Sequence, residues 1–531
     1  MIDSSFLAPL VNHRLSRRVA DAAFVQLAHR DVRALDALDL AKVQSETLLS
    51  LIHRARDTRF GQDHGFAKID SVADYQARVP VRSYEYFWEH YWKGYPDIAD
   101  QTWPGFMPYF ALSSGTTSGA TKYIPVSMEM VKSNRQAART TMALFRHAFP
   151  KHRIFTGQFF FLGGNTDVNL LANGARGGDL SGIAAREVPA AVRPLTFPPL
   201  ELSRIPKWEE KMPRLAEAAA KADIVALSGV PSWMALLFDM MKKVTGKNTI
   251  SEIWPNFRML IHGGTKFDGY RDLFRAQIGG DAFEFCEVYP ASEGFIATED
   301  PRYKLLRLVP DHDIFFEFVP CEDFDSKGVL KEKPTRHTVR EIEIGVRYAV
   351  VLTTCAGLWS YLIGDTVIFE KTDPPLMRFA GRTKNFLSAF GEHLIEEEVE
   401  KGIAFAAKAC GVFTGDFHVG PVFPSKPDAP GFHRYLVEFR DRVPDLTEFA
   451  MHLDKELDRL NEDYAAHRIG DLTMTRPEVV PVKLTALSAW VEARKGSLDV
   501  QAKVPRMDND GTLTATIFEW LKSNCKLVEH V

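Results

Sequence analysis

A ten-residue segment, Ser113-Ser-Gly-Thr-Thr-Ser-Gly-Ala-Thr-Lys122, concentrates the residue types that bind phosphate. Backbone N–H groups in a glycine-containing turn form a concave anion site, hydroxyls add donors, and a lysine adds a full positive charge. The spacing differs from that of a Walker A loop, in which the lysine directly follows the second glycine. Here Lys122 comes three positions after Gly119. By itself, the segment is compatible with a polyphosphate cradle or with a polar loop.

Two further segments place a carboxylate shortly after a tyrosine. Tyr289-Pro-Ala-Ser-Glu293 follows an apolar run at the end of a predicted strand, where α/β sheets bind ligands. Tyr289 can stack on a base, and Glu293 can hold Mg²⁺, which prefers carboxylate and phosphate oxygens. In Ser360-Tyr-Leu-Ile-Gly-Asp365, the aspartate can accept hydrogen bonds from two vicinal ribose hydroxyls. For each segment taken alone, the alternative of an ordinary acidic turn is favoured.

Two basic segments follow. Residues 379–393 contain Arg382 and lie at a predicted domain boundary, where a hinge can carry positively charged side chains. Near the end of the chain, Lys503 and Arg506 can both reach a phosphate, or they can belong to a solvated basic loop.

The elements that must position these residues are predicted from hydrophobic spacing. The 531 residues exceed what one hydrophobic core normally supports, so two or more domains are expected. Apolar residues at three-to-four spacing predict helices over 19–27 and 35–51. An aromatic-rich stretch from Tyr84 to Trp103 can stack a flat ligand, but its helical spacing favours packing.

From about residue 150 to 300, predicted strands alternate with predicted helices, which indicates a mainly parallel α/β sheet. The strands are expected at 154–162, 224–227 and 257–261, and the helices at 208–222 and 233–244. Residues 311–370 predict a β-rich subdomain with antiparallel strands at 314–319, 341–344, 349–354 and 366–370.

After Arg382 the pattern restarts with a helix at 396–408, a strand at 434–439, and an amphipathic helix carrying residues from Phe449 to Tyr464. We therefore predict an α/β chain with a large N-terminal domain over 1–381, a hinge over 382–395, and a smaller α+β domain over 396–531.

Composition excludes several classes of protein. The net charge of −4 provides no global basic field for nucleic acid or for an anionic membrane. The five cysteines are scattered without zinc or disulfide spacing, the N-terminus lacks the pattern of a secretory signal, and no apolar run is long enough to span a membrane. The sequence predicts a cytoplasmic protein without nucleic-acid or membrane partners.

The order of the chemical segments resembles the adenylate-forming superfamily. More narrowly, the chain resembles the Gretchen Hagen family, the auxin-responsive acyl-acid–amido synthetases. The resemblance covers essentially the whole chain and rests on residues 113–122, Trp254-Pro-Asn-Phe-Arg, Tyr289–Glu293, Leu460-Asn-Glu-Asp-Tyr464 and Gln501-Ala-Lys-Val-Pro-Arg506.

This resemblance implies an enzyme that uses ATP and Mg²⁺ to adenylate a carboxylic acid. It then transfers the acyl group to the amine of an amino acid, releasing AMP and pyrophosphate. The N-terminal domain would bind nucleotide and acid, and the C-terminal domain would be a mobile lid. Glu293 and Lys503 would be the catalytic groups. The triphosphate would be bound by Ser113, Ser114, Thr116, Thr117 and Lys122, and the metal ligand Glu293 would lie with Ser292 beside the α-phosphate. Tyr289 would lie near the adenine, and Asp365 would bind the ribose. Arg382 would contact ribose or phosphate, and Lys503 would contact the phosphates.

The chain departs from the family pattern at two places. Leu362 stands where plant relatives often carry an arginine, and Gly391-Glu-His-Leu replaces a common Asp-Lys pair. The acid pocket is expected near Met128, Val230 and Trp233 by position, but these residue types do not identify the substrate acid. An acyl-CoA ligase and a non-catalytic ATP- or acid-binding regulator remain the alternative functions.

Overall fold

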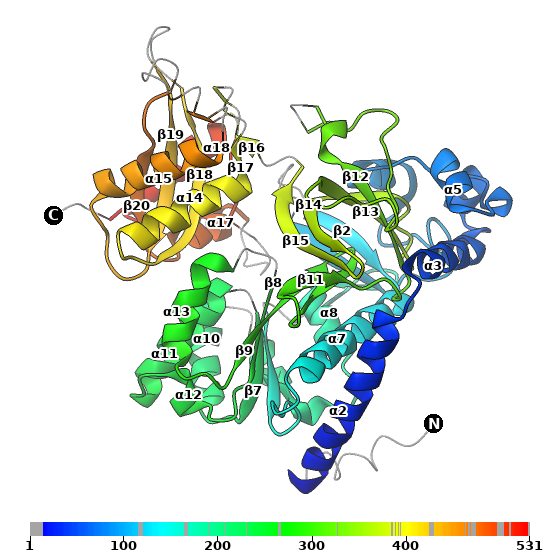
Figure 1. The fold of residues 1–531 in the computed structure, drawn as a ribbon, viewed down its shortest axis with the longest axis horizontal. Coiled ribbons are helices and arrows are strands. Elements are labelled where there is room, and N and C mark those ends of the chain that lie inside the picture. Colours follow the sequence, from blue (N-terminus) through cyan, green and yellow to red (C-terminus); the bar gives the residue numbers. More distant parts are fainter. Residues whose placement is uncertain are drawn as a thin grey trace. The chain divides into compact units, whose positions relative to one another are not determined.

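The chain forms two compact units, each described here by itself (Figure 1). The first comprises residues 1–115, 119–267 and 274–379, and the second comprises 380–531 together with 116–118 and 268–273. The computed structural model describes residues 14–528 except 115–120, 164–167, 191, 206–207, 230, 264–266, 326–327, 384–385, 388, 391, 393, 424–429, 462–463, 466–467, 469–473, 496–503 and 509–510. Among the helices in these ranges, none is long and apolar enough to cross a bilayer.

The helices and the strands are given separately below, each in chain order. The helices are α2 (Arg14–Asp36), α3 (Leu40–Ala55), α4 (Arg59–Asp63), α5 (Val72–Arg78), α6 (Tyr84–Phe87), α7 (Met128–Ala148), α8 (Leu180–Arg186), α9 (Leu200–Ser203), α10 (Trp208–Ala219), α11 (Pro231–Thr245), α12 (Ile250–Ile253), α13 (Asp268–Ile278), α14 (Glu396–Ala409), α15 (Leu446–Leu460), α17 (Ala486–Lys495) and α18 (Thr512–Ser523). The strands are β1 (Tyr109–Ser114), β2 (Thr121–Val126), β3 (Gln158–Leu162), β4 (Asn169–Leu170), β5 (Arg176–Gly178), β6 (Thr196–Phe197), β7 (Ile224–Gly229), β8 (Met259–Gly263), β9 (Glu284–Ala291), β10 (Gly294–Asp300), β11 (Leu305–Leu308), β12 (Ile314–Pro320), β13 (Arg347–Thr354), β14 (Tyr361–Thr372), β15 (Pro375–Arg382), β16 (Phe386–Leu387), β17 (Leu394–Ile395), β18 (Thr414–Val422), β19 (Phe432–Phe439) and β20 (Glu478–Val482).

One eleven-stranded sheet organises the first unit, in the order β12-β13-β14-β15-β11-β10-β9-β8-β7-β3-β6. The strands β6, β3, β7, β8 and β9 pair in parallel in that order. β10 pairs antiparallel with β9 and β11, β11 pairs antiparallel with β15, and β13 pairs antiparallel with β12 and β14. The α/β fold class is therefore confirmed. The predicted β-rich region continues the same sheet, and β9 is the strand at which the sheet changes from parallel to antiparallel.

Two local predictions differ from the structure. Residues 341–344 are not a strand, because the Glu341 carboxylate accepts hydrogen bonds from the backbone N–H and hydroxyl of Thr338, and this local turn replaces strand pairing. The predicted helix over 35–51 is divided between α2 and α3. Asp39 caps the second helix by accepting from Lys42 N–H at 3.1 Å, so a new helix begins there.

The aromatic-rich stretch packs into the main core of the first unit, as its spacing predicts. Phe87, Trp92 and Trp103 are buried among residues of the sheet. Beside them, a four-stranded sheet in the order β2-β1-β5-β4 carries the β1–β2 hairpin, whose strands include the two described ends of the hydroxyl-rich segment. The core therefore holds this hairpin against the main sheet.

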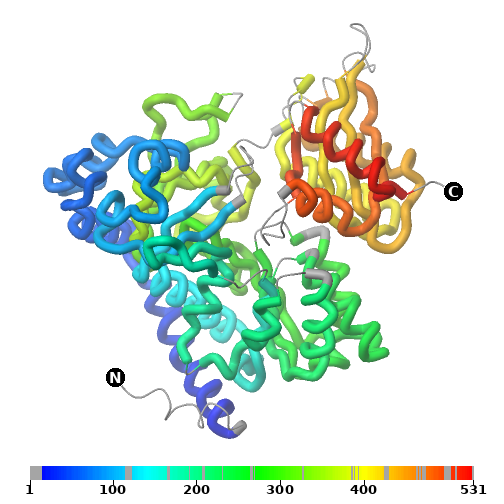
Figure 2. The backbone as a smooth tube through the Cα atoms, turned by 180° about the vertical axis from the view of Figure 1, so that it is seen from behind, coloured from blue at the N-terminus to red at the C-terminus, as the bar shows by residue number. Residues whose placement is uncertain are grey.

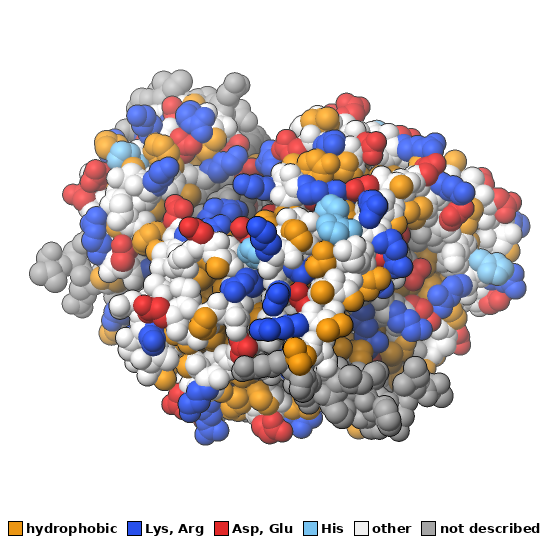
Figure 3. Space-filling view, turned by 60° about the horizontal axis from the view of Figure 1, so that its bottom comes forward, with side chains coloured by type: hydrophobic (Ala, Val, Ile, Leu, Met, Phe, Trp, Pro, Cys, Tyr) orange, Lys and Arg blue, Asp and Glu red, His pale blue; other side chains and the backbone are white. Residues whose placement is uncertain are grey.

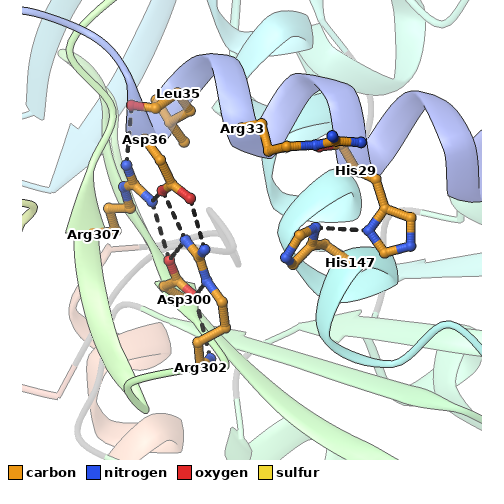
Figure 4. Close-up of polar contacts among 8 residues, drawn as sticks. All are labelled: His29, Arg33, Leu35, Asp36, His147, Asp300, Arg302 and Arg307. Carbon is orange, nitrogen blue, oxygen red and sulfur yellow. Dashed lines mark hydrogen bonds and ion pairs between the residues drawn. The ribbon is translucent and has the colours of Figure 1, made fainter.

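The N-terminal helix α2 packs along α7 and is fixed by buried charges at its end (Figures 1, 2 and 4). Arg302 donates to Asp36 at 2.8 Å and to Asp300 at 2.6 Å, and Arg307 donates to Asp300 at 3.2 Å. The side chain of Asp300 is fully buried. Hydrogen bonds from Arg302, and then from Arg307, lower the pKa of Asp36 to about 2. Two arginines thus join the helix end to the β10–β11 hairpin.

A histidine pair links the same two helices further along. The Nδ1 atoms of His29 and His147 lie 2.9 Å apart, so one ring must be neutral and accept the hydrogen bond (Figure 4). Burial, followed by the charge of His29, lowers the pKa of His147. A lowered histidine pKa means that this contact stabilises the fold above about pH 6.5 and weakens as the pH falls.

Replacing Asp300 by asparagine is expected to lower the free energy of unfolding by about 3 kcal/mol, because Arg302 and Arg307 would keep their charges with only the partly exposed carboxylate of Asp36 between them. Chemical denaturation of the full chain, followed by tryptophan fluorescence, measures this change. The matched control is Asp31→Asn, since Asp31 of α2 pairs with the exposed Arg139 of α7. That control should cost less than about 1 kcal/mol, and equal losses in the two variants would contradict the prediction.

The second unit is a three-stranded sheet in the order β18-β19-β20 between two helical layers (Figures 1 and 2). Tyr435 and Val437 of β19 pack with α14 and α15, and Leu436 packs with α17 and α18. This alternation is expected for a strand that is buried on both faces. The predicted helix at 396–408 and strand at 434–439 are confirmed as α14 and β19.

A buried carboxyl group makes this unit sensitive to alkaline pH. Glu438 is 3% exposed and accepts from Leu487 N–H at 3.1 Å. Burial, followed by the nearby charge of Asp416, raises the pKa of Glu438 to about 8 from 4.5. The folded state therefore favours the neutral form, and its stabilising effect is complete below about pH 4.5 and declines as the pH rises towards 8.

Glu438→Gln is expected to remove this decline, because glutamine keeps the shape and an acceptor oxygen but carries no charge. Calorimetric melting of the full chain at about pH 5, 6.5 and 8 measures the effect. The variant should melt higher than the parent protein at the alkaline end only. Glu519→Gln, an exposed change on α18, is the control and should leave the pH profile unaltered. A variant profile that still declines towards pH 8 would refute the assignment.

The surface carries both signs of charge. Basic and acidic side chains are interspersed over much of the face shown in Figure 3, in line with the small net charge of −4.

Candidate nucleotide-binding site

The tyrosine–glutamate segment forms a tight hairpin turn in the first unit. Tyr289 lies on β9, and Ser292 and Glu293 form the two-residue connection to β10, with Ala291 paired to Gly294. A Cβ at Gly294 would lie 2.7 Å from Cδ1 of Ile314, so a larger residue would require the Ile314 side chain to move. The turn is thus held closely against β12, and it lies at the end of the strand where the sheet changes direction.

The tyrosine–aspartate segment lies on β14, where the pairing with β13 is irregular. Ala349 pairs with Thr366 and Val351 pairs with Leu362, so β14 contains two more residues than its partner over this interval. Gly364 lies in the extra stretch with φ +85°, a backbone conformation that favours glycine. Such bulges redirect side chains next to functional sites. The bulge brings Asp365, which is 8% exposed, towards β9.

Hydrogen bonds connect the two segments directly. The Tyr289 hydroxyl donates to Asp365 Oδ2 at 2.8 Å, and the Tyr361 hydroxyl donates to Glu293 Oε1 at 3.2 Å. β9 and β14 are not neighbours in the sheet order, so the sheet curves strongly enough to bring them together. The structure therefore places Tyr289, Glu293 and Asp365, three of the residues singled out from the sequence, in one cluster.

A buried polar network fixes the start of β14. Ser360 has φ +44°, which is unfavourable for a residue with a side chain. Its N–H donates to Thr353 Oγ1 at 2.9 Å, and its hydroxyl accepts from Arg336 at 2.6 Å. Arg336 also donates to Glu317 from two nitrogens, at 2.9 and 2.8 Å. This network holds the strained residue directly before Tyr361.

Lys122 lies on β2, paired with Ser113 across the hairpin. Its Nζ atom lies 5.2 Å from the centre of the Tyr84 ring, a cation–π distance. The Tyr84 hydroxyl accepts from Tyr123 N–H at 3.0 Å, and burial raises the pKa of Tyr84 to about 12. The aromatic stretch thus packs in the core and also supports the lysine of the hydroxyl-rich segment.

The residues predicted for the acid pocket lie on two helices. Met128 is the first residue of α7 and is 39% exposed, and Trp233 is half-buried on α11. The first turn of α7 lies beside the hairpin turn, since a Cβ at Gly294 would be 3.7 Å from Cε of Met130. Met128 is thereby placed near the Glu293 turn.

Several predicted site residues lie elsewhere. Arg382 is the last residue of β15 and groups with the second unit. For Ser114, the structure describes only the backbone, as the last residue of β1. Thr116, Thr117, Val230 and Lys503 lie outside the described residues.

Sequence reasoning gave no role to Tyr361 and favoured packing over ligand stacking for Tyr84. The signal for Tyr361 was present, because Tyr289 and Tyr361 each stand four positions before an acidic residue. No such signal marks Tyr84, whose place beneath Lys122 depends on the tertiary fold.

Solved structures define the class of fold. The chain matches the GH3.15 acyl acid amido synthetase with a TM-score of 0.76 and 18% identity, covering 94% of this chain and 96% of that one. It also matches a 2-hydroxyisobutyryl-CoA ligase in the postadenylation state, with a TM-score of 0.58 and 15% identity over 91% of each chain. The chain therefore shares its fold with this amido synthetase and this CoA ligase.

The chain belongs to the GH3 family. The family's N-terminal domain model matches residues 35–169, its central domain model matches 307–382, and its C-terminal domain model matches 397–512. Among curated relatives, the jasmonoyl–L-amino acid synthetase JAR4 of Nicotiana attenuata is 23% identical over 443 residues, covering 70% of this chain and 74% of the relative. The resemblance inferred from the ordered motifs is thereby confirmed.

Proposed function

We propose that the protein is an ATP-dependent acyl-acid–amido synthetase. It adenylates a carboxylic acid and passes the acyl group to an amino acid, forming an amide and releasing AMP and pyrophosphate. The observation that carries the proposal is the cluster in which the Tyr289 hydroxyl donates to the Asp365 carboxylate and the Tyr361 hydroxyl donates to the Glu293 carboxylate. A nucleotide bound to Mg²⁺ needs one carboxylate for its ribose and another for its metal. Family membership adds the amide-forming half of the reaction.

The proposed nucleotide contacts follow from the chemistry of each side chain. Asp365 accepts hydrogen bonds from the ribose hydroxyls, and the Tyr289 ring lies near the adenine. Lys122 and the hydroxyl-rich segment bind the phosphates through Ser113, Ser114, Thr116 and Thr117, with Ser292 beside the α-phosphate, Arg382 on ribose or phosphate, and Lys503 on the phosphates during adenylation.

Glu293 suits Mg²⁺, because this ion is usually held by one or two carboxylates together with substrate phosphates. No cluster of three or more metal-binding side chains occurs in the described ranges, and a metal shared with ATP requires none. When bound, Mg²⁺ would neutralise charge on the phosphate oxygens. Tyr361 holds one oxygen of the Glu293 carboxylate through its hydrogen bond.

The reaction proceeds in two balanced steps. An oxygen of the substrate carboxylate attacks the α-phosphorus of ATP, the bond to the β-phosphate oxygen breaks, and pyrophosphate leaves. The nitrogen of an amino acid then attacks the acyl carbon, the bond to the AMP oxygen breaks, and the amine proton is lost. Negative charge gathers at phosphorus in the first transition state, where preorganised N–H, hydroxyl and lysine groups stabilise it.

In this proposal, residues 1–381 bind the nucleotide and the acid, residues 382–395 form a hinge, and residues 396–531 form a lid. A lysine on a separate lid can serve adenylation and then withdraw for amide formation. Met128, Val230 and Trp233 are the proposed acid-pocket residues. A small carboxylic acid and an amino acid are the proposed partners, and the cytosol is the proposed compartment, in keeping with five free cysteines.

One experiment tests the function against its two rivals. Purified full-length protein is mixed with ATP, Mg²⁺ and a panel of carboxylic acids, and pyrophosphate release is followed. Mass analysis then detects products formed with amino acids or with CoA. Acid-dependent pyrophosphate and an amide support the proposal. A CoA thioester without any amide would instead identify an acyl-CoA ligase, and no acid-dependent pyrophosphate across the panel would favour a non-catalytic regulator.

A further inference from the structure

The two tyrosine–carboxylate segments have the same spacing, and their contacts are crossed. In each segment the tyrosine stands four positions before the acidic residue: Tyr289 before Glu293, and Tyr361 before Asp365. Each tyrosine nevertheless donates to the carboxylate of the other segment, at 2.8 Å for Tyr289 to Asp365 and 3.2 Å for Tyr361 to Glu293. The arrangement is reciprocal.

Strand geometry explains why the contacts cross. Neither tyrosine is joined to its own segment's carboxylate by a regular strand, because Ser292 and Glu293 form the β9–β10 turn and Gly364 lies in the bulge of β14. The curvature of the sheet, however, brings β9 and β14 within hydrogen-bond distance of each other. Each carboxylate is therefore supported from the opposite segment.

Both tyrosine rings are fixed by packing. Tyr361 is 1% exposed and Tyr289 is 7% exposed. The Tyr289 ring lies edge-on to Phe379 with centroids 5.7 Å apart, and the Tyr361 ring lies 5.8 Å from Phe87. An ionised carboxylate can only accept a hydrogen bond, so the Tyr361 hydroxyl is the donor to Glu293.

We propose that Tyr289 and Tyr361 form a crossed clasp in which each hydroxyl positions the carboxylate of the other segment. Tyr361 aims Glu293 at the metal of the nucleotide, and Tyr289 aims Asp365 at the ribose. This inference rests on the proposed nucleotide-dependent function. Both tyrosines act through carboxylates, so their hydroxyls are positioning groups, and the Tyr289 ring retains its separate place near the base.

The clasp predicts crossed effects of two conservative variants. Tyr361→Phe should raise the Mg²⁺ or Mn²⁺ concentration needed for half-maximal binding in the presence of ATP about tenfold, because a hydrogen bond to a charged group is lost. It should leave the preference for ATP over 2′-deoxy-ATP unchanged. Tyr289→Phe should reduce that preference about tenfold and leave metal binding unchanged.

The measurements are calorimetric titrations of nucleotide and electron paramagnetic resonance of Mn²⁺ on the full chain, neither of which requires turnover. Tyr348→Phe is the matched control, since its buried hydroxyl only accepts from Glu343 N–H at 3.0 Å on the neighbouring strand β13. It should change neither reading, and a melting curve for each variant identifies general loss of structure.

The possible results test the clasp and the proposed function separately. Crossed effects support the clasp. The clasp is overturned if Tyr289→Phe changes metal binding and Tyr361→Phe changes the preference for ATP over 2′-deoxy-ATP. It is also overturned if both variants change both readings equally, even when the parent protein binds Mg²⁺ and ATP. A parent protein that binds no nucleotide overturns the proposed function, and the clasp with it.

Discussion

Replacing Lys503 by alanine is expected to slow adenylation about a hundredfold to a thousandfold and to change the affinity for ATP less than roughly threefold. The reason is that negative charge gathers at the α-phosphorus only as the carboxylate attacks, so a lysine charge at this place stabilises the transition state more than bound ATP. Acid-dependent pyrophosphate release and calorimetric ATP binding measure the two quantities. Amide formation from a supplied acyl-adenylate should be spared, because no pyrophosphate leaves in that step.

The control for this variant is Lys522→Ala, which removes an exposed lysine of α18 from the same unit. It should leave both half-reactions at the parent rates. Equal losses of ATP affinity and adenylation rate in Lys503→Ala would mean that the lysine binds the ground state. A loss of amide formation from supplied acyl-adenylate as large as the loss of adenylation would contradict the assignment to the first step.

Replacing Asp365 by asparagine is expected to weaken ATP binding about tenfold to a hundredfold, because two charge-assisted hydrogen bonds to the ribose hydroxyls become neutral ones. Asparagine keeps an oxygen that can accept from the Tyr289 hydroxyl, so the strand bulge should be retained. The preference for ATP over 2′-deoxy-ATP should shrink in parallel. Calorimetric titration with the two nucleotides measures both effects.

Asp373→Asn is the matched control, since Asp373 is an exposed residue in the connection between β14 and β15. It should bind both nucleotides as the parent protein does. If Asp365→Asn binds ATP normally and instead lowers the melting temperature, then Asp365 is a structural residue of the bulge, and the ribose contact must be made by another group.

Local patterns predicted most of the elements. The helix at 396–408 was recognised from the three-to-four spacing of its apolar residues, and the strands at 224–227 and 434–439 from their short apolar runs. Residues 341–344 misled this reasoning, since Ile342 and Ile344 alternate like strand residues. The side chain of Glu341 instead closes a turn on Thr338, and only one of the two isoleucines is buried.

The sequence by itself determined the kind of protein. The order of the hydroxyl-rich segment, the two tyrosine–carboxylate segments and the terminal lysine was sufficient to identify the family, because these residue types at these spacings are set by the chemistry of a nucleotide. The tertiary structure decided which side chains meet. β9 and β14 are separated in the sheet order, and Tyr289 meets Asp365 only because the sheet curves and β14 carries two extra residues. Sheet curvature is a non-local property, so the sequence indicated Tyr289, Glu293 and Asp365 but neither the role of Tyr361 nor how the four residues of the clasp pair.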